Sequence, residues 1–332
     1  MKIAFFDTKE YDRKVFDKKN KKYGYDITYL ESKLNKETAP LANGFDVICI
    51  FVNDIVDKET MHILKDCGVK LIALRCAGFN NIDTDEMVDE IKIVRVPAYS
   101  PYAVAEHAVA LLLSIDRKIY KAYQRTRKYN FSLNGLLGFD INGKTVGVIG
   151  TGKIGTVFIK IMKGFGANVI AYDMYKNEDS AKKLDFKYVS LDELYKNSDI
   201  ISLHCPLTKS TNKIINADTI ETMKNGVIII NTSRGKLIDT DSLITKLSEG
   251  QIGGVGLDVY EDEEEFFLND MSNSYIRDKD LSILLSMPNV VITSHQAFFT
   301  VEALNKIAID TCENIKEIFE NGSCVNEVKK TD

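Results

Sequence analysis

Three polar groups follow apolar, strand-like segments in the second half of the chain. Arg234 comes after one such segment, the acidic run Glu261–Glu265 after the next, and His295 after the last. Ligands of open α/β sheets bind outside the carboxyl ends of parallel strands, so we expect the three loops to meet at one site. A guanidinium, a carboxylate and an imidazole together can bind an acid and move a proton.

Arg234 lies in a short loop before the helix expected near Asp239. Its planar guanidinium stays charged and can bind a substrate carboxylate through two parallel hydrogen bonds. The alternative is a surface arginine paired with Asp239 or Asp241. We favour substrate binding because the loop follows a buried strand.

His295 is the histidine that follows a strand end in the same row as Arg234. Imidazole exchanges protons near neutral pH, which suits a general acid or base. His204 ends another expected strand and ranks second, whereas His62 and His107 fall on helical stretches and are expected to be structural.

The acidic run offers a partner for this histidine. Most of the run must be a solvated loop, but one carboxylate close to the strand end could accept a hydrogen bond from the ring and hold its tautomer. Spacing alone leaves four candidates open: Glu261, Glu263, Glu264 and Glu265.

A glycine-rich turn lies near the middle of the chain, within Thr145–Gly155. We expect Gly150 to make a tight turn, Gly152 to let the backbone approach a pyrophosphate, and Gly155 to let helix and strand pack closely. The pyrophosphate would rest on the N–H groups at the start of a helix predicted for Thr156–Gly164.

Asp173 stands 18 residues after Gly155, at the end of the next expected strand. An acid there accepts hydrogen bonds from a ribose hydroxyl and repels a 2′-phosphate, so the pattern predicts NAD rather than NADP. With Arg234 anchoring a carboxylate and His295 protonating the adjacent carbonyl oxygen, the nicotinamide would deliver a hydride to the carbon between. The residues therefore predict reduction of a 2-oxo acid to a 2-hydroxy acid.

Strand-like segments alternate with helical patterns along the chain, which indicates parallel sheets of βαβ units. Five strands are expected before the glycine-rich turn: Ile3–Phe6, Ile27–Tyr29, Val47–Phe51, Leu71–Leu74 and Ile93–Val96. Seven more are expected from the turn onward: Val146–Ile149, Asn168–Tyr172, Lys187–Val189, Ile200–Leu203, Gly226–Asn231, Gly254–Leu257 and Val290–Ile292. Long helices are predicted for Val104–Ile119 and Glu302–Glu320.

The two groups of strands predict an α/β protein with two doubly wound parallel-sheet domains, and 332 residues suit about two domains. The segment Pro97–Pro101 marks the expected boundary, because its prolines disfavour helix. We expect the nucleotide-binding domain, residues 100–296, to be inserted into a first domain made of residues 1–99 and 297–332.

The composition is that of an ordinary globular protein, with 27% charged and 45% hydrophobic residues and a net charge of −5. It indicates no nucleic-acid partner and no membrane association. Six scattered cysteines without a signal peptide predict reduced thiols and a cytoplasmic location. The four histidines lack ligand spacing, so we expect no metal.

Ordered motifs run along essentially the whole chain: Arg75–Asn81, Val94–Pro101, Val104–His107, Gly150–Gly155, Ser202–Thr208, Asn231–Gly235, Leu257–Glu261 and Ser294–Phe298. In these motifs the chain resembles the D-isomer-specific 2-hydroxyacid dehydrogenases, and is most similar to their bacterial fermentative D-lactate dehydrogenase branch. The resemblance implies a Rossmann NAD-binding domain inserted into a flavodoxin-like substrate (catalytic) domain.

The resemblance also implies the roles of single residues. The family's catalytic glutamate lies five residues after the aspartate corresponding to Asp258, which points to Glu263. His295 would donate the proton and Arg234 would bind the substrate's carboxylate and carbonyl. Further substrate contacts are implied for Ala77, Gly78, Tyr99, Phe298 and Phe299. Beside the glycines and Asp173, cofactor contacts are implied for Lys153, Ile154, Cys205, Pro206, Thr211, Thr232, Ser233 and Asp258.

The activity implied by the resemblance is NADH-dependent reduction of pyruvate to D-lactate. Family members form dimers through the helix and arm of residues 104–140, so we expect a homodimer, or dimers that pair into tetramers. An R-2-hydroxyisocaproate dehydrogenase, or another D-2-hydroxyacid dehydrogenase, is the main alternative. A more distant one is a non-catalytic, NAD(H)-sensing scaffold similar to the C-terminal-binding corepressors.

Overall fold

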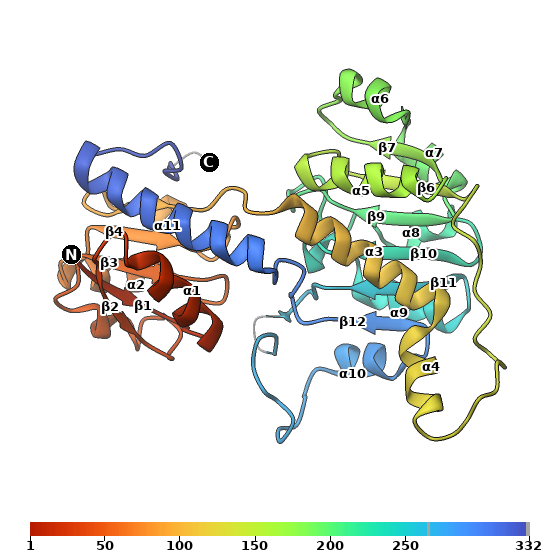
Figure 1. The fold of residues 1–332 in the computed structure, drawn as a ribbon, viewed down its shortest axis with the longest axis horizontal. Coiled ribbons are helices and arrows are strands. Elements are labelled where there is room, and N and C mark those ends of the chain that lie inside the picture. Colours follow the sequence, from red (N-terminus) through yellow and green to blue (C-terminus); the bar gives the residue numbers. More distant parts are fainter. Residues whose placement is uncertain (264–265, 330–332) are drawn as a thin grey trace. The chain divides into compact units, whose positions relative to one another are not determined.

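The computed structural model describes residues 1–263 and 266–329, so Glu264 and Glu265, two of the candidate acids, lie outside the described residues. The chain divides into two compact units (Figure 1). Unit 1 contains Met1–Ser100 and the described residues from Phe299 onward, and unit 2 is Pro101–Phe298.

Unit 1 is built on a parallel sheet with the strand order β2-β1-β3-β4-β5 among its described residues. Its strands are β1 (Lys2–Phe5), β2 (Asp26–Tyr29), β3 (Val47–Ile50), β4 (Leu71–Leu74) and β5 (Lys92–Val94). Its helices are α1 (Glu10–Asn20), η1 (Ala39–Ala42), α2 (Lys58–Asp66), η2 (Thr84–Glu86) and α11 (Val301–Asn321). This strand order is the flavodoxin-like one.

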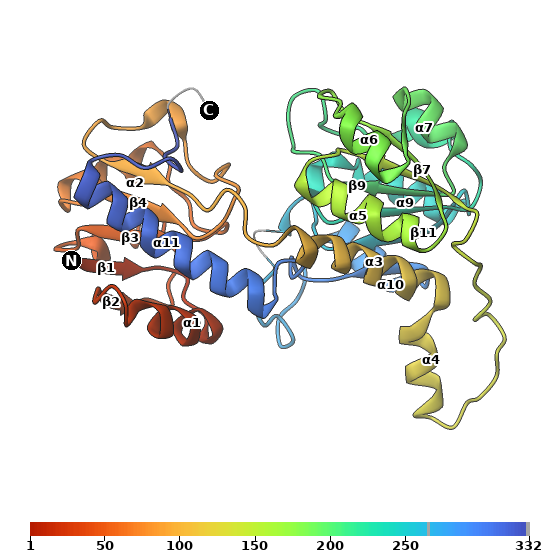
Figure 2. The same cartoon turned by 45° about the horizontal axis from the view of Figure 1, so that its top comes forward.

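Helix α11 packs against α1 and β4, although it comes from the far end of the chain (Figures 1 and 2). Thr300 caps its start by accepting the backbone N–H of Ala303, and Gly322, with φ 72°, ends it. Its buried side chains recur at helical spacing, so one face of α11 packs against the rest of unit 1. The apolar side chains of this face are Ala303, Ile307, Ala308, Cys312, Ile315 and Ile318.

A buried arginine lies at the carboxyl edge of the unit 1 sheet. The guanidinium carbon of Arg75, the residue after β4, lies 4.4 Å from the ring centroid of Phe5 and 4.9 Å from that of Phe51. Its Nη2 donates a 2.9 Å hydrogen bond to the carbonyl of Asp7. These contacts hold together the loops that follow β1, β3 and β4, because a buried guanidinium needs both stacking and acceptors.

Unit 2 contains a longer parallel sheet with the order β12-β11-β10-β9-β6-β7-β8 in its described part. The strands are β6 (Thr145–Ile149), β7 (Asn168–Tyr172), β8 (Lys187–Tyr188), β9 (Ile200–Leu203), β10 (Val227–Asn231), β11 (Ile252–Leu257) and β12 (Val290–Ile292). From β8 to β11 this is the Rossmann order, and β12 extends it. The predicted α/β class with two doubly wound parallel sheets is confirmed.

Helices cover both faces of the unit 2 sheet. The helices of unit 2 are α3 (Pro101–Arg117), α4 (Ile119–Thr126), α5 (Lys153–Gly164), α6 (Glu178–Leu184), α7 (Leu191–Asn197), α8 (Ala217–Glu221), η3 (Gly235–Leu237), α9 (Thr240–Ser248) and α10 (Lys279–Ser286). On β10, Ile228 and Ile230 enter the core beneath α3 and α5, whereas Ile229 enters the core on the opposite face. Burial on both faces explains why this strand is apolar throughout.

The strand order of unit 2 reverses between β6 and β9. The chain passes from β6 outward to β7 and β8, and then returns to β9 on the other side of β6. In open α/β sheets a ligand crevice forms at such a reversal, outside the carboxyl ends of the strands. The loops that flank it are the glycine-rich turn and the segment after Leu203.

The structure corrects three predicted helix bounds by two or more residues. Helix α3 begins at Pro101 rather than Val104, because proline is tolerated in the first turn of a helix. Helix α5 begins at Lys153 rather than Thr156, so Gly155 lies inside its first turn. Helix α3 ends at Arg117 rather than Ile119, because Lys118 adopts a left-handed conformation with φ 49° and α4 starts after it. A tertiary contact stabilises this end: the Lys118 ammonium donates to the carbonyl of Leu137, far along the following arm.

The six cysteines are free thiols. Within residues 1–263 and 266–329, no helix has both the length and the apolar character needed to cross a membrane.

Candidate active site

The glycine-rich turn after β6 is shaped by close backbone contacts. Gly150 has φ 96°, and a Cβ on it would lie 2.5 Å from the backbone nitrogen of Cys205. A Cβ on Gly155 would lie 2.0 Å from the carbonyl oxygen of Gly150. A Cβ on Gly152 would meet no atom within 4 Å. The first and third glycines are therefore required by internal packing, whereas Gly152 faces open space that a ligand can occupy.

Asp173 lies beside this turn. One of its carboxylate oxygens accepts the backbone N–H of Thr151 at 2.6 Å and the Thr151 hydroxyl at 3.0 Å, and the other accepts the N–H of Tyr175 at 2.9 Å. Gly152 provides no side-chain cap for α5, so the backbone N–H groups at the helix start, at Lys153 and Ile154, are suited to bind phosphate oxygens. The arrangement fits a dinucleotide.

The loop after β10 contributes a hydroxyl without a protein partner. Thr232 is 9% exposed, and its Oγ1 makes no hydrogen bond to any described residue. The neighbouring Ser233 donates from its hydroxyl to the carbonyl of Cys205 at 2.6 Å, which joins this loop to the one after β9. A buried unpaired hydroxyl is costly unless a ligand or water completes it, so Thr232 is consistent with a bound group at this position.

The loop after β9 is itself ordered by hydrogen bonds. The Thr211 hydroxyl donates to the carbonyl of Pro206 at 2.7 Å. His204 lies behind the glycine-rich turn, where its ring centroid is 4.9 Å from that of Phe158 and its Nε2 is 2.9 Å from the Ser202 hydroxyl. Burial lowers the pKa of His204 to about 3, so this histidine is neutral at pH 7 and unsuited to donate a proton.

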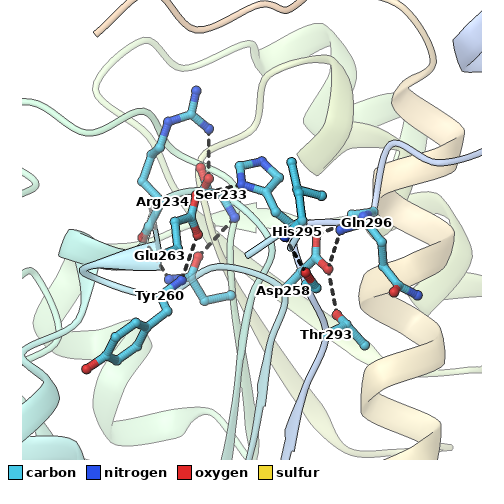
Figure 3. A network of polar contacts seen from close by, with 12 residues as sticks. Ser233, Arg234, Asp258, Tyr260, Glu263, Thr293, His295 and Gln296 are labelled. Carbon is cyan, nitrogen blue, oxygen red and sulfur yellow. Dashed lines mark hydrogen bonds and ion pairs between the residues drawn. The ribbon is translucent and has the colours of Figure 1, made fainter. Parts of the chain in front are cut away.

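His295 and Glu263 are brought together by the loops after β12 and β11. The Nδ1 of His295 lies 2.6 Å from Oε1 of Glu263, and the side chains are 21% and 17% exposed (Figure 3). The second carboxylate oxygen of Glu263 accepts the backbone N–H of Tyr260 at 2.9 Å. Both oxygens are therefore engaged, and the acid holds the ring in a defined orientation.

The structure describes two of the four candidate acids, Glu261 and Glu263. Glu261 accepts a hydrogen bond from the Thr240 hydroxyl at 3.0 Å and does not contact His295, whereas Glu263 does. The sequence pattern alone left this choice open, because a pattern of acids does not show how the loop folds back.

Arg234 is held in the neighbouring loop by its backbone. The Asn231 side chain donates to the carbonyl of Arg234 at 2.8 Å and accepts the N–H of Ser233 at 3.0 Å. A Cβ on Gly235 would lie 2.1 Å from the carbonyl of Tyr260, so only glycine lets this loop pack against the loop that carries Glu263. Asp239, an alternative partner for Arg234, pairs with Lys213 instead at 2.7 Å.

The Arg234 guanidinium retains hydrogen-bonding capacity. Its Nη1 donates to the carbonyl of Ser233 at 2.8 Å, and it forms no ion pair with any described carboxylate. A guanidinium has five N–H donors, so most of them are available to a substrate carboxylate.

A buried aspartate organises the loop that carries His295. Asp258 is 0% exposed, and its carboxylate accepts the Thr293 hydroxyl at 2.5 Å and the backbone N–H groups of Gln296 and Ala297 at 2.9 and 2.8 Å (Figure 3). Its own carbonyl accepts the N–H of His295 at 2.8 Å. Burial opposes ionisation, but the nearby His107 together with hydrogen bonds from Thr293 and the backbone outweighs it and holds the pKa of Asp258 below its usual range.

The remaining predicted substrate residues are divided between the units. Ala77, Gly78, Tyr99 and Phe299 belong to unit 1, where the ring of Phe299 packs edge-on against Tyr11 with the centroids 4.7 Å apart. Phe298 is buried in unit 2. The sequence pattern did not reveal that Thr293 and His107 contact Asp258; the motif Val104–His107 was the signal available for the latter.

The roles of the second and third glycines of the turn can be separated by experiment. In Gly152→Ala, we expect an unchanged melting temperature and at least about a tenfold weaker NADH affinity, because the new Cβ fills only space for the pyrophosphate. In Gly155→Ala, we expect both the melting temperature and the NADH affinity to fall, because the Cβ collides with the turn. The free energy of unfolding should decrease by about 1–3 kcal/mol. NADH fluorescence titration and thermal unfolding measure both, and wild-type affinity in Gly152→Ala would contradict this assignment.

The chain is similar to known proteins over its whole length. Residues 109–297 match the family model of the NAD binding domain of D-isomer specific 2-hydroxyacid dehydrogenase. D-lactate dehydrogenase of Escherichia coli K12 is 47% identical over 329 residues, which cover 99% of this chain and 100% of that protein. Its apo structure matches with a TM-score of 0.91 at 46% identity, again covering 99% and 100% of the two chains.

Two further solved structures are similar. One, described as the pyruvate reductase of Chlamydomonas reinhardtii, has a TM-score of 0.90 and 44% identity and covers 96% of each chain. The other, a D-2-hydroxyisocaproate dehydrogenase, has a TM-score of 0.87 and 35% identity and covers 99% of each chain. The glycine-rich turn is a nucleotide-binding motif, and the similarity to these relatives extends over the full length of the chain. The chain therefore belongs to the D-isomer specific 2-hydroxyacid dehydrogenases, and its cofactor is NAD.

Proposed function

We propose that this protein catalyses the reversible, NADH-dependent reduction of pyruvate to D-lactate. The observation that carries the proposal is the 2.6 Å contact between His295 Nδ1 and Glu263, placed at the strand-end row that also carries Arg234. Similarity to D-lactate dehydrogenase of E. coli and to the pyruvate reductase of C. reinhardtii supports pyruvate as the substrate.

Arg234 binds the substrate in this proposal. Its guanidinium forms two parallel hydrogen bonds to the pyruvate carboxylate, which fixes the orientation of the adjacent carbonyl. Because the loop is held by Asn231 and packed at Gly235, little backbone freedom is lost when Arg234 binds the substrate.

His295 protonates the carbonyl oxygen. Glu263 accepts the Nδ1 proton, so Nε2 is the atom that carries a proton to the substrate during reduction and removes it during oxidation. Nε2 has no partner among the described residues, which leaves it available. NADH, when bound along the glycine-rich turn and Asp173, supplies the hydride that reduces the carbonyl carbon.

We extend the proposal to the organisation of the protein. Unit 2 carries the cofactor site and unit 1 would be the substrate domain. Substrate contacts by Ala77, Gly78, Tyr99, Phe298 and Phe299 stay predictions from the resemblance. A cytoplasmic location is supported by the six free thiols. A fermentative role stays a prediction from the resemblance.

We also propose a homodimer formed through α3, α4 and the following arm. Figure 1 shows α4 and this arm, in yellow, extending from the body of unit 2. Large apolar side chains of the arm are highly exposed: Tyr129 at 86%, Phe131 at 72%, Leu133 at 81% and Leu137 at 88%. Such a group of exposed apolar side chains typically marks an interaction surface.

The substrate is tested by steady-state assay of NADH oxidation with pyruvate, 2-oxoisocaproate and phenylpyruvate. We expect the highest kcat/KM with pyruvate, and D-lactate as the product by chiral analysis. A preference for 2-oxoisocaproate by more than about tenfold would instead indicate a D-2-hydroxyisocaproate dehydrogenase, since apolar pockets discriminate by size over that range. NADH binding without turnover of any 2-oxo acid would indicate a sensing scaffold.

The roles of His295 and Arg234 are tested by substitution. His295→Ala should lower kcat by about 10²–10⁴-fold with little change in NADH affinity, because only proton transfer is lost. Arg234→Ala should raise the pyruvate KM and lower kcat together, because the carboxylate is bound in both the ground state and the transition state. Near-normal kcat in either variant would contradict the assigned role.

The proposed interface is tested by sedimentation velocity. Wild-type protein should sediment as a dimer or as paired dimers, and Leu133→Glu with Leu137→Glu should shift it toward the monomer, because buried charge opposes association. Val325→Glu is the matched control, since Val325 is 91% exposed but lies in unit 1. An unchanged sedimentation coefficient in the arm variant would contradict this interface.

A further inference from the structure

His107 contacts the polar groups that support the His295 loop. It lies on α3, and its Nε2 is 2.9 Å from Thr293 Oγ1 and 3.4 Å from Asp258 Oδ1. Helix α3, pale gold in Figure 3, packs against β11 and β12, the strands that lead into the loops of these two residues. The imidazole therefore lies where the helix meets both strand ends.

The directions of these hydrogen bonds follow from counting protons. Asp258, held ionised by its donors, can only accept, so the Thr293 hydroxyl donates its single proton to Oδ1 across 2.5 Å. The hydroxyl must then accept from His107, which requires a proton on Nε2. A donor series results: His107 donates to Thr293, and Thr293 donates to Asp258.

Asp258, which receives the hydrogen bond of Thr293, also binds the backbone around His295. It accepts the N–H groups of Gln296 and Ala297 with its carboxylate and that of His295 with its carbonyl. His295 has φ 48°, a left-handed conformation that is uncommon for residues with a Cβ and that needs support from the surrounding structure. The hydrogen bonds of Asp258 provide that restraint.

We propose that His107 is a positioning residue for His295, acting through Thr293 and Asp258. Glu263 orients the ring of His295, whereas the His107 series holds the backbone from which the ring projects. The location of Nε2 depends on both, because a ring oriented on a displaced backbone does not reach the substrate oxygen. This inference rests on the proposed role of His295 as the proton donor.

The test compares His107→Leu, His107→Gln and Thr293→Val in the full-length protein with NADH and pyruvate. His107→Leu removes the donor and should lower kcat by about tenfold or more, because small displacements of a reacting group are costly. Pyruvate KM and NADH affinity should stay within about twofold, because Arg234 and the glycine-rich turn are untouched. The solvent deuterium isotope effect on kcat should rise as proton transfer becomes more limiting.

A conservative variant and a double variant distinguish a positioning role of His107 from a general loss of structure. Glutamine can present an N–H donor near the position of Nε2, so His107→Gln should recover most of kcat. Thr293→Val should resemble His107→Leu, and the double variant should lose no more than either single one, because both substitutions interrupt the same series.

Ile115→Val is the matched control on the same helix. Its side chain packs against Gly254 and Gly256 of β11 rather than against the His295 loop, so it should keep wild-type kcat and isotope effect. Wild-type kcat in His107→Leu, no recovery in His107→Gln, or additive losses in the double variant would overturn the proposal.

The inference and the proposed function fail in different ways. If His295→Ala retains kcat, or wild-type protein reduces no 2-oxo acid, the proposed function is wrong. If His295→Ala loses activity while His107→Leu does not, only the role of His107 is wrong.

Discussion

The buried carboxylate of Asp258 joins the ends of two neighbouring strands in unit 2. It follows β11 and accepts hydrogen bonds from three residues of the loop after β12. Burial alone would disfavour its charge, and these donors, together with His107, keep its pKa low. The charged acid and its donors therefore stabilise one another, and His295 owes its backbone conformation to them.

The same edge of the sheet brings the other functional groups together. Because the strands are parallel, the loops after β10, β11 and β12 emerge side by side, with Arg234, Glu263 and His295 on successive ones. Close approach of these loops needs a residue without a Cβ at Gly235. In the glycine-rich turn, Gly155 likewise lacks a Cβ where one would collide with the carbonyl oxygen of Gly150. Glycine thus serves two different purposes in unit 2, internal packing and access for a ligand.

Much of this architecture can be read from local patterns. Apolar runs located the strands to within two residues at either end, since a strand buried on both faces must be apolar throughout. Helix ends were harder to predict. In the structure, the predicted helix ends one residue before Lys118, whose backbone is left-handed and whose side chain bonds to an arm 19 residues away. The pattern of acids likewise did not distinguish Glu261 from Glu263, and the family resemblance was needed to choose.

The amino-acid pattern was sufficient for the α/β class, the NAD turn and the 2-oxo acid chemistry, because each depends on residue types at short, regular spacing. The geometry of the proton donor depends on contacts between distant residues. His295 meets Glu263 across 32 positions of the chain, and His107 meets Thr293 across 186. No local periodicity encodes such pairs, since they arise only when α3 packs on the sheet and the strands align. His107 was for this reason expected to be a structural histidine, and its place beside Asp258 and Thr293 emerged only from the folded chain.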